Sequence, residues 1–176
     1  TATCVFMVTV TDDVAPNVIC TPATVVLDAN GTGSLTANQV FDSASDNCGV
    51  NPTPSISNTA FSCADVGAQA VTVSVTDING NTGSCIADVT IVDNTAPEIT
   101  CTDRAVALNE SGRYTLTAEE INGGTADACG TPTISIPATD FDCSKLGANT
   151  VTLTSTDVNG NSALCTATVT VSDNTA

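Results

Sequence analysis

The stretch Val71–Asn81 reads Val-Thr-Val-Ser-Val-Thr-Asp-Ile-Asn-Gly-Asn, and it returns later in the chain as Val151–Asn161, Val-Thr-Leu-Thr-Ser-Thr-Asp-Val-Asn-Gly-Asn. Apolar and hydroxyl-bearing side chains alternate along each copy, which is the pattern of a strand with one buried face. The Asn-Gly pair that follows is a strong signal for a hairpin turn, and a second alternating run, at 86–92 or 166–172, comes after it. The stretch therefore predicts one β-hairpin in each of two copies.

The cysteines repeat with the same period. Self-similarity at a fixed period predicts an array of like modules, which more often builds length or displays a surface than carries one active site. The cysteines of the first copy recur in the second in the same order and with nearly identical spacing: Cys20, Cys48, Cys63 and Cys85 return as Cys101, Cys129, Cys143 and Cys165.

The same period sets the expected module boundaries. The two whole repeats cover roughly 14–95 and 96–176, and the phrase Asp93-Asn94-Thr95-Ala96 at the first junction recurs as 173–176. Cys4 precedes Cys85 by one such period, so residues 1–13 are expected to form the last strand of a preceding repeat. We expect Cys4 to pair with an upstream cysteine, and the chain to be an excerpt of a longer array.

Composition excludes several classes of function. Three basic residues against 19 acidic ones give a net charge of −16, the opposite of the basic footprint that nucleic-acid binding needs. No apolar run is as long as the roughly 18 residues that a membrane-spanning helix needs, so no direct membrane insertion is expected. The sequence has no histidine, which rules out a Ser-His-Asp triad or a Cys-His pair within it, and we expect no enzyme activity.

The predicted architecture is all-β. Short helical turns are expected only at 36–40 and 118–121, and about seven short strands in each repeat of roughly 80 residues favour an immunoglobulin-like β-sandwich. Four cysteines per repeat suggest disulfides made in an oxidising compartment. We therefore predict tandem, disulfide-stapled β-sandwich modules arranged as an elongated rod.

At this point the residues resemble a known family. The phrase Val-Gly-Ala-x-x-Val-Thr-Val-x-Val-Thr-Asp-x-Asn-Gly-Asn, the Asp-Asn-Thr-Ala-Pro junction and the stretch 46–49 (Asp-Asn-Cys-Gly) are similar to the hyalin repeat (HYR). The resemblance implies an immunoglobulin-like sandwich used for extracellular adhesion. This variant looks most like the tandem arrays of Bacteroidetes-type surface adhesins, including gliding-motility adhesins, which implies export by the type IX route and a place on the bacterial cell surface.

In such sandwiches the first and last strands run side by side and parallel. This geometry pairs Cys20 with Cys85 and Cys101 with Cys165, and by elimination Cys48 with Cys63 and Cys129 with Cys143. Four cysteines allow three pairings per module, so the alternatives stay open.

Acidic and amide residues at the module junctions are the candidate metal ligands. If the loops follow the expected strand directions, they converge in two sets, and carboxylate and amide oxygens suit calcium. The alternative is that Asn-Gly and Asp simply favour turns. The two sets are Asp12, Asp13, Asp46, Asp77, Asn79 and Asn81, and Asp93, Asn94, Asp127, Asp157, Asn159 and Asn161.

The leading hypothesis is a structural stalk or spacer in an extracellular surface adhesin or filament, reinforced by disulfides and by calcium at the junctions. Its partners would be neighbouring repeats of the same chain, surface glycans and other cell-surface proteins. One alternative is a ligand-binding module that contacts a glycan or a protein through its loops, and another is an accessory array of a secreted enzyme. Ser43 lies in an Asp-Ser-Ala motif that resembles the O-glycan acceptor of this bacterial group.

Overall fold

The alternating stretches form the predicted hairpins. In the computed structural model, which describes residues 2–50, 53–137 and 140–174, β7 (Gly67–Thr76) pairs antiparallel with β8 (Thr82–Val92). The second copy pairs β15 (Gly147–Thr156) with β16 (Ser162–Ser172) in the same way. Gly80 and Gly160 close the two turns with φ of 99° and 94°, a left-handed conformation in which only glycine is unstrained.

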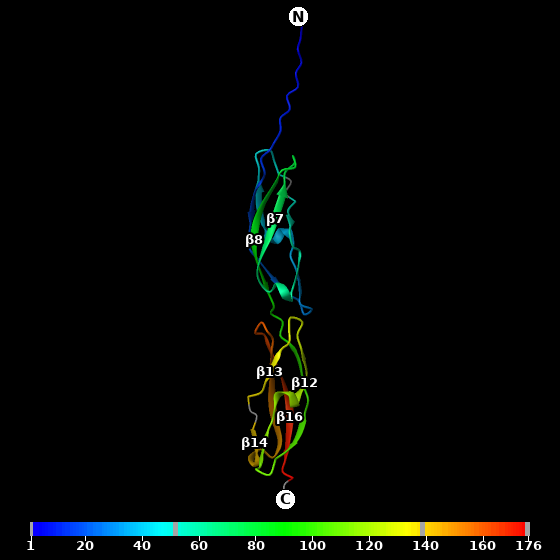
Figure 1. The fold of residues 1–176 in the computed structure, drawn as a ribbon, viewed down its shortest axis with the longest axis vertical. Helices are drawn as coiled ribbons and strands as arrows, with labels where there is room; N and C mark the ends of the chain where they lie inside the picture. The colour runs from blue at the N-terminus through cyan, green and yellow to red at the C-terminus, as the bar shows by residue number, and fades with distance from the viewer. Residues whose placement is uncertain (1, 51–52, 138–139, 175–176) are drawn as a thin grey trace. The chain divides into compact units, whose positions relative to one another are not determined.

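The strand order of the first copy is repeated in the second. We call β1–β8 the first module and β9–β16 the second module (Figure 1). The other elements of the first module are β1 (Asn17–Cys20), β2 (Ala23–Val26), β3 (Thr32–Ser34), α1 (Ala37–Val40), β4 (Phe41–Ser45), β5 (Ser55–Ile56), β6 (Ala60–Ser62) and the 3-10 turn η1 (Cys63–Asp65). Those of the second are β9 (Glu98–Cys101), β10 (Arg104–Ala107), β11 (Arg113–Thr115), α2 (Ala118–Ile121), β12 (Asn122–Ala126), β13 (Thr133–Ser135), β14 (Asp140–Asp142) and η2 (Cys143–Lys145).

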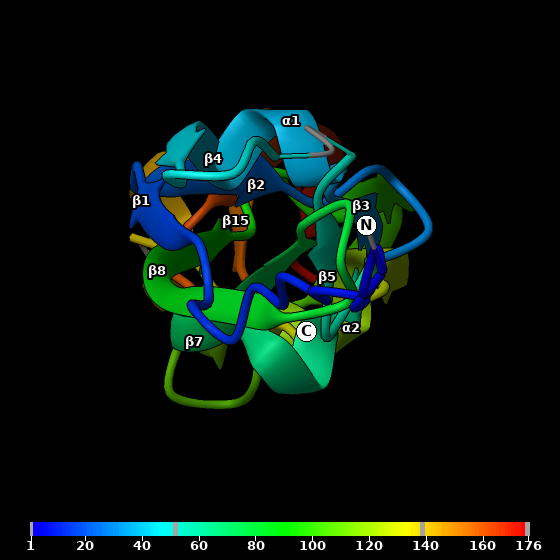
Figure 2. The same ribbon diagram turned by 90° about the horizontal axis from the view of Figure 1, so that it is seen from above.

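Each module is a β-sandwich, as predicted. One face is a four-stranded sheet of order β2-β8-β7-β5, and the pairs β1-β4 and β3-β6 complete the module. Figure 2 shows β1, β4 and α1 on the side opposite β7 and β8. The second module repeats the arrangement with the sheet β10-β16-β15-β13 and the pairs β9-β12 and β11-β14.

The period-two pattern of the hairpins builds the core. In β15 and β16 the side chains on one face are buried, whereas the alternating threonines of β16 are exposed. These buried residues form one cluster with the apolar residue of α2 and those of the neighbouring strands and loops, so a single face of the sheet is covered. The cluster contains Val106, Leu108, Leu116, Ile121, Phe141, Val151, Leu153, Ala167, Val169 and Val171.

The short helices begin at the expected places. α1 and α2 each follow a threonine, and Thr36 N–H donates a hydrogen bond of 2.7 Å to Gln39 Oε1. Thr117 N–H donates likewise to Glu120 Oε2 at 2.9 Å. These reciprocal caps satisfy amide groups that such a short helix would otherwise leave unpaired.

The first strand is divided between the two layers. β1 pairs antiparallel with β4, and β2 then pairs parallel with β8, with Ala23 opposite Val89 and Val26 opposite Val92. Because β2 and β8 run the same way, the chain enters a module at one end and leaves it at the other. We call these the entry end, where β1 begins, and the exit end, where β8 ends.

The structure contains the predicted first-to-last disulfides. Cys20 at the end of β1 bonds Cys85 of β8 with a Cα–Cα distance of 5.9 Å, and Cys101 bonds Cys165 at 5.7 Å. Both distances lie in the usual range for a disulfide.

The other two predicted pairs are wrong: the structure contains neither Cys48–Cys63 nor Cys129–Cys143, because Cys48 and Cys143 are free thiols. The reason lies in the strand geometry. In the first module Val50 forms a bridge with Asp77, which places Cys48 at the entry end. Cys63 begins η1, just before the start of β7, where Gly67 pairs with Ile91 at the exit end.

Residues 2–13 form no strand in this structure, and the assignment of 1–13 to the last strand of a preceding repeat stays a prediction. Their apolar side chains are exposed, Val5 and Met7 by 91% and 92%. A strand needs a hydrogen-bonded neighbour, and within the described residues none pairs with this segment. The compact units of the structure are Thr1–Val26 with Thr32–Val92, and Leu27–Gly31 with Asp93–Ala176, while the repeat boundaries at 14–95 and 96–176 stay predictions. None of the described helices is long and apolar enough to cross a membrane.

Candidate functional site: the acidic cluster at the entry end

The turn between β7 and β8 is organised by one buried carboxylate. Asp77 Oδ1 accepts hydrogen bonds from the backbone N–H groups of Asn79 and Asn81 at 2.9 and 2.8 Å. Asp77 Oδ2 accepts a third from Asn81 Nδ2 at 2.8 Å. The aspartate thus holds the Asn-Gly turn closed by bonding its own backbone two and four residues ahead.

The same turn also holds the segment that enters the module. Asn79 Nδ2 donates to Asp12 Oδ2 at 2.9 Å, and Asn81 Nδ2 donates to the Asp12 carbonyl at 3.0 Å. The two asparagine side chains therefore tie the turn to a segment that lies far earlier in the chain.

The second module repeats this network bond for bond. Asp157 accepts from the backbone N–H groups of Asn159 and Asn161 and from Asn161 Nδ2, at 2.9, 2.8 and 2.8 Å. Asn159 Nδ2 donates to Asp93 Oδ2 at 2.8 Å, and Asn161 Nδ2 to the Asp93 carbonyl at 3.1 Å. Since Asp77, Asp93 and Asp157 are all buried, the network is a built feature of the repeat.

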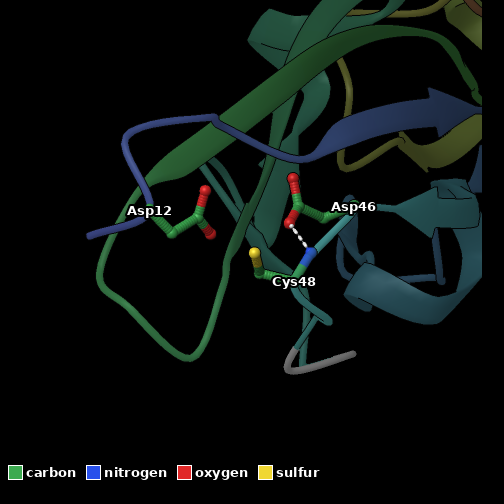
Figure 3. A group of neighbouring side chains, drawn as sticks. All are labelled: Asp12, Asp46 and Cys48. Atoms are coloured by element: carbon green, nitrogen blue, oxygen red, sulfur yellow. Dashed lines mark hydrogen bonds between the residues drawn. The ribbon is translucent and has the colours of Figure 1, made fainter. Parts of the chain in front are cut away.

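A second group of side chains lies beside Asp12. Asp46 follows β4, and its Oδ2 accepts a hydrogen bond of 2.8 Å from Cys48 N–H. Ligand atoms of Asp12, Asp46 and Cys48 lie within 4.8 Å of one another, and Figure 3 shows the three side chains pointing toward a common space. We call Asp12, Asp46, Cys48 and the turn residues Asp77, Asn79 and Asn81 the entry-end cluster of the first module.

One oxygen of this cluster lacks a partner. Asp46 Oδ1 is buried, and among the residues that the structure describes it is the one buried side-chain polar atom without a hydrogen-bond partner. A desolvated carboxylate oxygen beside a second carboxylate is unfavourable unless a cation or a water molecule compensates it.

The counterpart in the second module has a different cysteine chemistry. Asp93, Asp127 and Cys129 also place ligand atoms within 4.8 Å of one another, and Asp127 Oδ1 accepts from Cys129 N–H at 2.8 Å. Cys129 is disulfide-bonded, however, so it cannot supply a thiolate. A metal site common to both modules would therefore have to rest on the carboxylates.

The electrostatics of the first cluster keep its thiol protonated. Loss of hydration raises the pKa of Cys48, and the negative charge of Asp12, to which the thiol donates a hydrogen bond, raises it further, with smaller contributions from Asp46 and Asp77. A protonated thiol is a poor metal ligand and a poor nucleophile. The cluster is thus better suited to a hard cation than to thiolate chemistry.

The pKa values of the two turn carboxylates, Asp77 and Asp157, are lowered, whereas that of the Cys48 thiol is raised. Burial alone would raise the pKa of Asp157, but the hydrogen bonds from Asn161, Asn159 and Gly160 outweigh it and lower the pKa below its ordinary value. The pKa of Asp77 is lowered by the same balance of effects. Both carboxylates are therefore charged and engaged with N–H donors.

The sequence analysis located the cluster but not the role of each residue. Asp13 and Asn94 are exposed, and the described hydrogen bonds of the cluster do not include them. Cys48 and Cys129 were not among the predicted ligands, although the repeated Asp-x-Cys spacing could have indicated them. Ser43 lies exposed on β4 and donates a hydrogen bond of 3.3 Å to Asp42 Oδ2, and its glycosylation stays a prediction.

No family model matches the chain, and no curated protein matches it. Solved structures show a distant similarity to tandem immunoglobulin-like and cadherin-like β-sandwich domains. Sidekick-1 immunoglobulin domains 1–4 share 11% identity at a TM-score of 0.45, covering 90% of this chain and 49% of that one. Human Protocadherin-24 EC1-2 shares 15% sequence identity at a TM-score of 0.44, and the match covers 92% of this chain and 100% of that one. Protocadherin gammaB7 EC3-6 shares 17% identity at a TM-score of 0.41, and the match covers 91% of this chain and 51% of that one. The chain thus spans about half the length of two of these, and similarity at this level carries no functional conclusion.

The depressed pKa of Asp157 predicts acid sensitivity of the second module. A lowered folded-state pKa contributes stability that is present above the unfolded pKa of about 3.9 and is lost as pH falls through the folded value. Asp157→Asn should remove this contribution, so urea midpoints of the variant should fall less steeply with pH below about 4. At pH 7 the variant should be less stable by about 1–3 kcal/mol, because its amide oxygen can still accept from the backbone N–H groups but its NH2 group then faces the Asn161 Nδ2 donor, which loses its acceptor.

The exposed carboxylate of Glu110 provides the control for this measurement. Glu110→Gln should keep the wild-type midpoint at pH 7. An Asp157→Asn variant with the wild-type pH profile would show that the hydrogen-bonded turn does not stabilise the folded state.

Proposed function

We propose that the chain is a pair of load-bearing spacer modules in the stalk of an extracellular surface adhesin or filament. The single observation that supports this most is the disulfide that joins the first strand of each module to the last. In Cys20–Cys85 the bonded residues are 65 apart in sequence, and in Cys101–Cys165 they are 64 apart. Tension applied through the two termini would cross each module through these bonds.

The position of each bond protects most of the module from that tension. The chain before Cys20 leads in from the entry end, and the chain after Cys85 leads out through β8 to the exit end. The residues between the two cysteines, including β7 and most of the core, lie outside the covalent path. They could lose hydrogen bonds under load without lengthening the stalk.

Other features agree with an extracellular, non-enzymatic role. Structural disulfides persist in oxidising compartments, and a charge of −16 on 176 residues keeps neighbouring molecules apart in solution. Adhesion to surface glycans or to cell-surface proteins would then be a property of the larger protein that these modules extend. The resemblance to the hyalin-repeat arrays of Bacteroidetes-type adhesins supports a location on the bacterial cell surface. It also supports export by the type IX route.

Calcium belongs to this proposal with a smaller ligand set than the sequence predicted. Asp77 and Asp157 are occupied by N–H donors, so they do not offer free oxygens. The carboxylates of Asp12 and Asp46, with the unpartnered Asp46 Oδ1, fit a hard divalent cation whose remaining ligands are water and carbonyl oxygens. Such an ion would neutralise two neighbouring negative charges.

The load-bearing role predicts a large dependence of extension on disulfide state. In a variant with Cys48, Cys63, Cys129 and Cys143 replaced by serine, only the two first-to-last bonds change on reduction. Stretched as single molecules, oxidised modules should release little length when they unfold. Reduced modules should each release an additional length of about 200 Å, since about 65 residues then extend at about 3.4 Å each.

The same molecules stretched before and after reduction provide the control. Equal length increments in the two states would contradict the proposal that tension crosses each module through the disulfide.

The calcium site predicts a shift in the melting temperature of the first module. Calcium well above its dissociation constant should raise that temperature by several degrees over EGTA, on the order of 5 °C, because binding to the folded state stabilises it. Asp46→Asn should abolish the shift, since it removes the charge but retains an oxygen for Cys48 N–H. Differential scanning calorimetry measures both.

Asp42→Asn is the matched control, because Asp42 is an exposed aspartate on the neighbouring strand β4. It should retain the wild-type shift. The same shift in Asp46→Asn, or none in the wild type, would remove calcium from the proposal and leave the disulfide argument intact.

A further inference from the structure

Two Asn-Gly steps carry the contacts that hold the entering segments. The sequence contains four such steps, at 30–31, 79–80, 122–123 and 159–160. Asn-Gly is the dipeptide at which asparagine deamidates most readily, because glycine has no Cβ to crowd the attacking backbone nitrogen. The steps at 79–80 and 159–160 close the long hairpins, and their asparagine side chains bond the segment that enters the module. A change in either asparagine therefore acts directly on the entry end.

Deamidation replaces the side-chain amide by a carboxylate. The glycine nitrogen attacks the asparagine Cγ, a C–N bond forms, and the side-chain nitrogen leaves as ammonia together with the proton of the glycine N–H. Water then opens the resulting cyclic imide to aspartate or isoaspartate, and the ammonia takes up the carboxyl proton as ammonium. The reaction consumes only water and requires neither an oxidant nor an enzyme.

The folded first module shields its site at both reacting groups. Asn79 Nδ2 donates to Asp12 Oδ2 at 2.9 Å, which holds the side-chain amide on the entering segment. Gly80 N–H donates to the Asp77 carbonyl at 3.4 Å and also faces the Asp77 carboxylate. The attack requires the Gly80 nitrogen to give up its proton, and a neighbouring negative charge disfavours that step. Both contacts have to open before the ring can form.

The second module contains the same shielded site. Asn159 Nδ2 donates to Asp93 Oδ2 at 2.8 Å, and Gly160 N–H is one of the donors to the Asp157 carboxylate. Each site lies within a single compact unit of the structure, so the shielding is a property of the individual repeat. The step at 30–31 is different, since Asn30 is exposed and within the described residues its side-chain amide makes no hydrogen bond.

Deamidation would set two carboxylates against each other. At Asn79 the product carboxylate would take the place of the amide nitrogen that now lies 2.9 Å from Asp12 Oδ2. Two carboxylates at hydrogen-bond distance repel each other unless they share a proton. The Asp77 carboxylate is close by as well, since Asn79 N–H donates to it. The bond from Asn81 Nδ2 to the Asp12 carbonyl would then have to hold the entering segment against this repulsion.

We propose that Asn79 and Asn159 are sites of spontaneous deamidation that make release of the entering segment irreversible. While the network is closed, it shields both asparagines from the reaction. Once the segment has been released and the asparagine has deamidated, the new charge prevents the network from closing again. This inference requires neither calcium nor an adhesive function.

Deamidation rates at individual asparagines test the shielding. The oxidised wild-type chain is kept in mildly alkaline buffer with EGTA, and peptide mapping by mass spectrometry follows each Asn-Gly step. Asn79 and Asn159 should deamidate about tenfold or more slowly than Asn30, because hydrogen bonds to charged groups have to break first. Asp12→Ala should accelerate the reaction at Asn79 by about tenfold, since one such bond is lost, and should leave the rate at Asn159 unchanged.

Asp13→Ala is the matched control, because Asp13 is the exposed neighbour of Asp12. It should keep the wild-type rate at both sites. Equal rates at Asn30, Asn79 and Asn159 in the wild type, or a wild-type rate at Asn79 in Asp12→Ala, would overturn the proposal. So would an acceleration that occurs only with loss of hydrogen-exchange protection throughout β7 and β8, because it would reflect unfolding of the module.

Asn79→Asp tests the consequence independently of the rate at which the product forms. Differential scanning calorimetry at neutral pH should show a first module that melts several degrees below the wild type, because the added charge repels Asp12. Asn79→Ser, which removes the same hydrogen bond, suits a turn and adds no charge, should lower the melting temperature less. The second module should melt as in the wild type. An Asn79→Asp variant as stable as Asn79→Ser would contradict the one-way release.

Discussion

The parallel pairing of β2 with β8, held by the disulfide between Cys20 and Cys85, is the constraint on which each module depends. The pairing brings the first strand to the edge of the sheet that contains the long hairpin. The disulfide connects the end of β1 to the middle of β8, and β1 belongs to the opposite layer. A loop of this length lowers the entropy of the unfolded chain by an amount worth about 4 kcal/mol in the chain-entropy model. For a module with a small aliphatic core, that is a large share of a typical folding free energy.

The entry-end cluster complements this clamp with polar bonds. The buried turn aspartate satisfies the backbone of the Asn-Gly turn, and the two asparagine side chains hold the segment that enters the module. Because the network is the same in both copies, the strongly acidic composition is not only a solubility feature. Part of the charge is buried, and its hydrogen-bond donors lower the pKa of Asp77 and Asp157. Because Asp77 already accepts N–H donors, the carboxylates left to bind a cation in the first module are those of Asp12 and Asp46, and the latter includes the unpartnered Oδ1.

The fold could be predicted from local signals because those signals are strong here. Alternating valine and threonine with Asn-Gly determine the hairpins, and the threonine caps determine the two helical turns. The pairing of Cys20 with Cys85 followed from the parallel edge strands of a sandwich. The pairing of Cys48 with Cys63 failed because elimination within one repeat assumed that both loops lie at the same end. Sequence spacing does not reveal the end of a long hairpin at which a loop lies.

The candidate site was predictable in place but not in detail. The sequence brought Asp12, Asp46 and the turn residues together, yet it could not distinguish an aspartate that binds its own turn from one that faces open space. That distinction depends on which oxygens already accept hydrogen bonds, as for Asp77. The prediction for residues 1–13, which rests on the spacing of Cys4 from Cys85, concerns a strand of a preceding repeat, and such a strand needs neighbouring strands that supply hydrogen bonds.

Native-state hydrogen exchange of a variant with Cys20→Ser and Cys85→Ser tests the central claim most directly. If the disulfide holds the first strand on the last, the amides of β2 should lose protection first, and those of the hairpin β7–β8 should stay more protected. The second module, with Cys101–Cys165 intact, should exchange as in the wild type. Unchanged protection of β2, or an equal loss throughout both modules, would contradict the account.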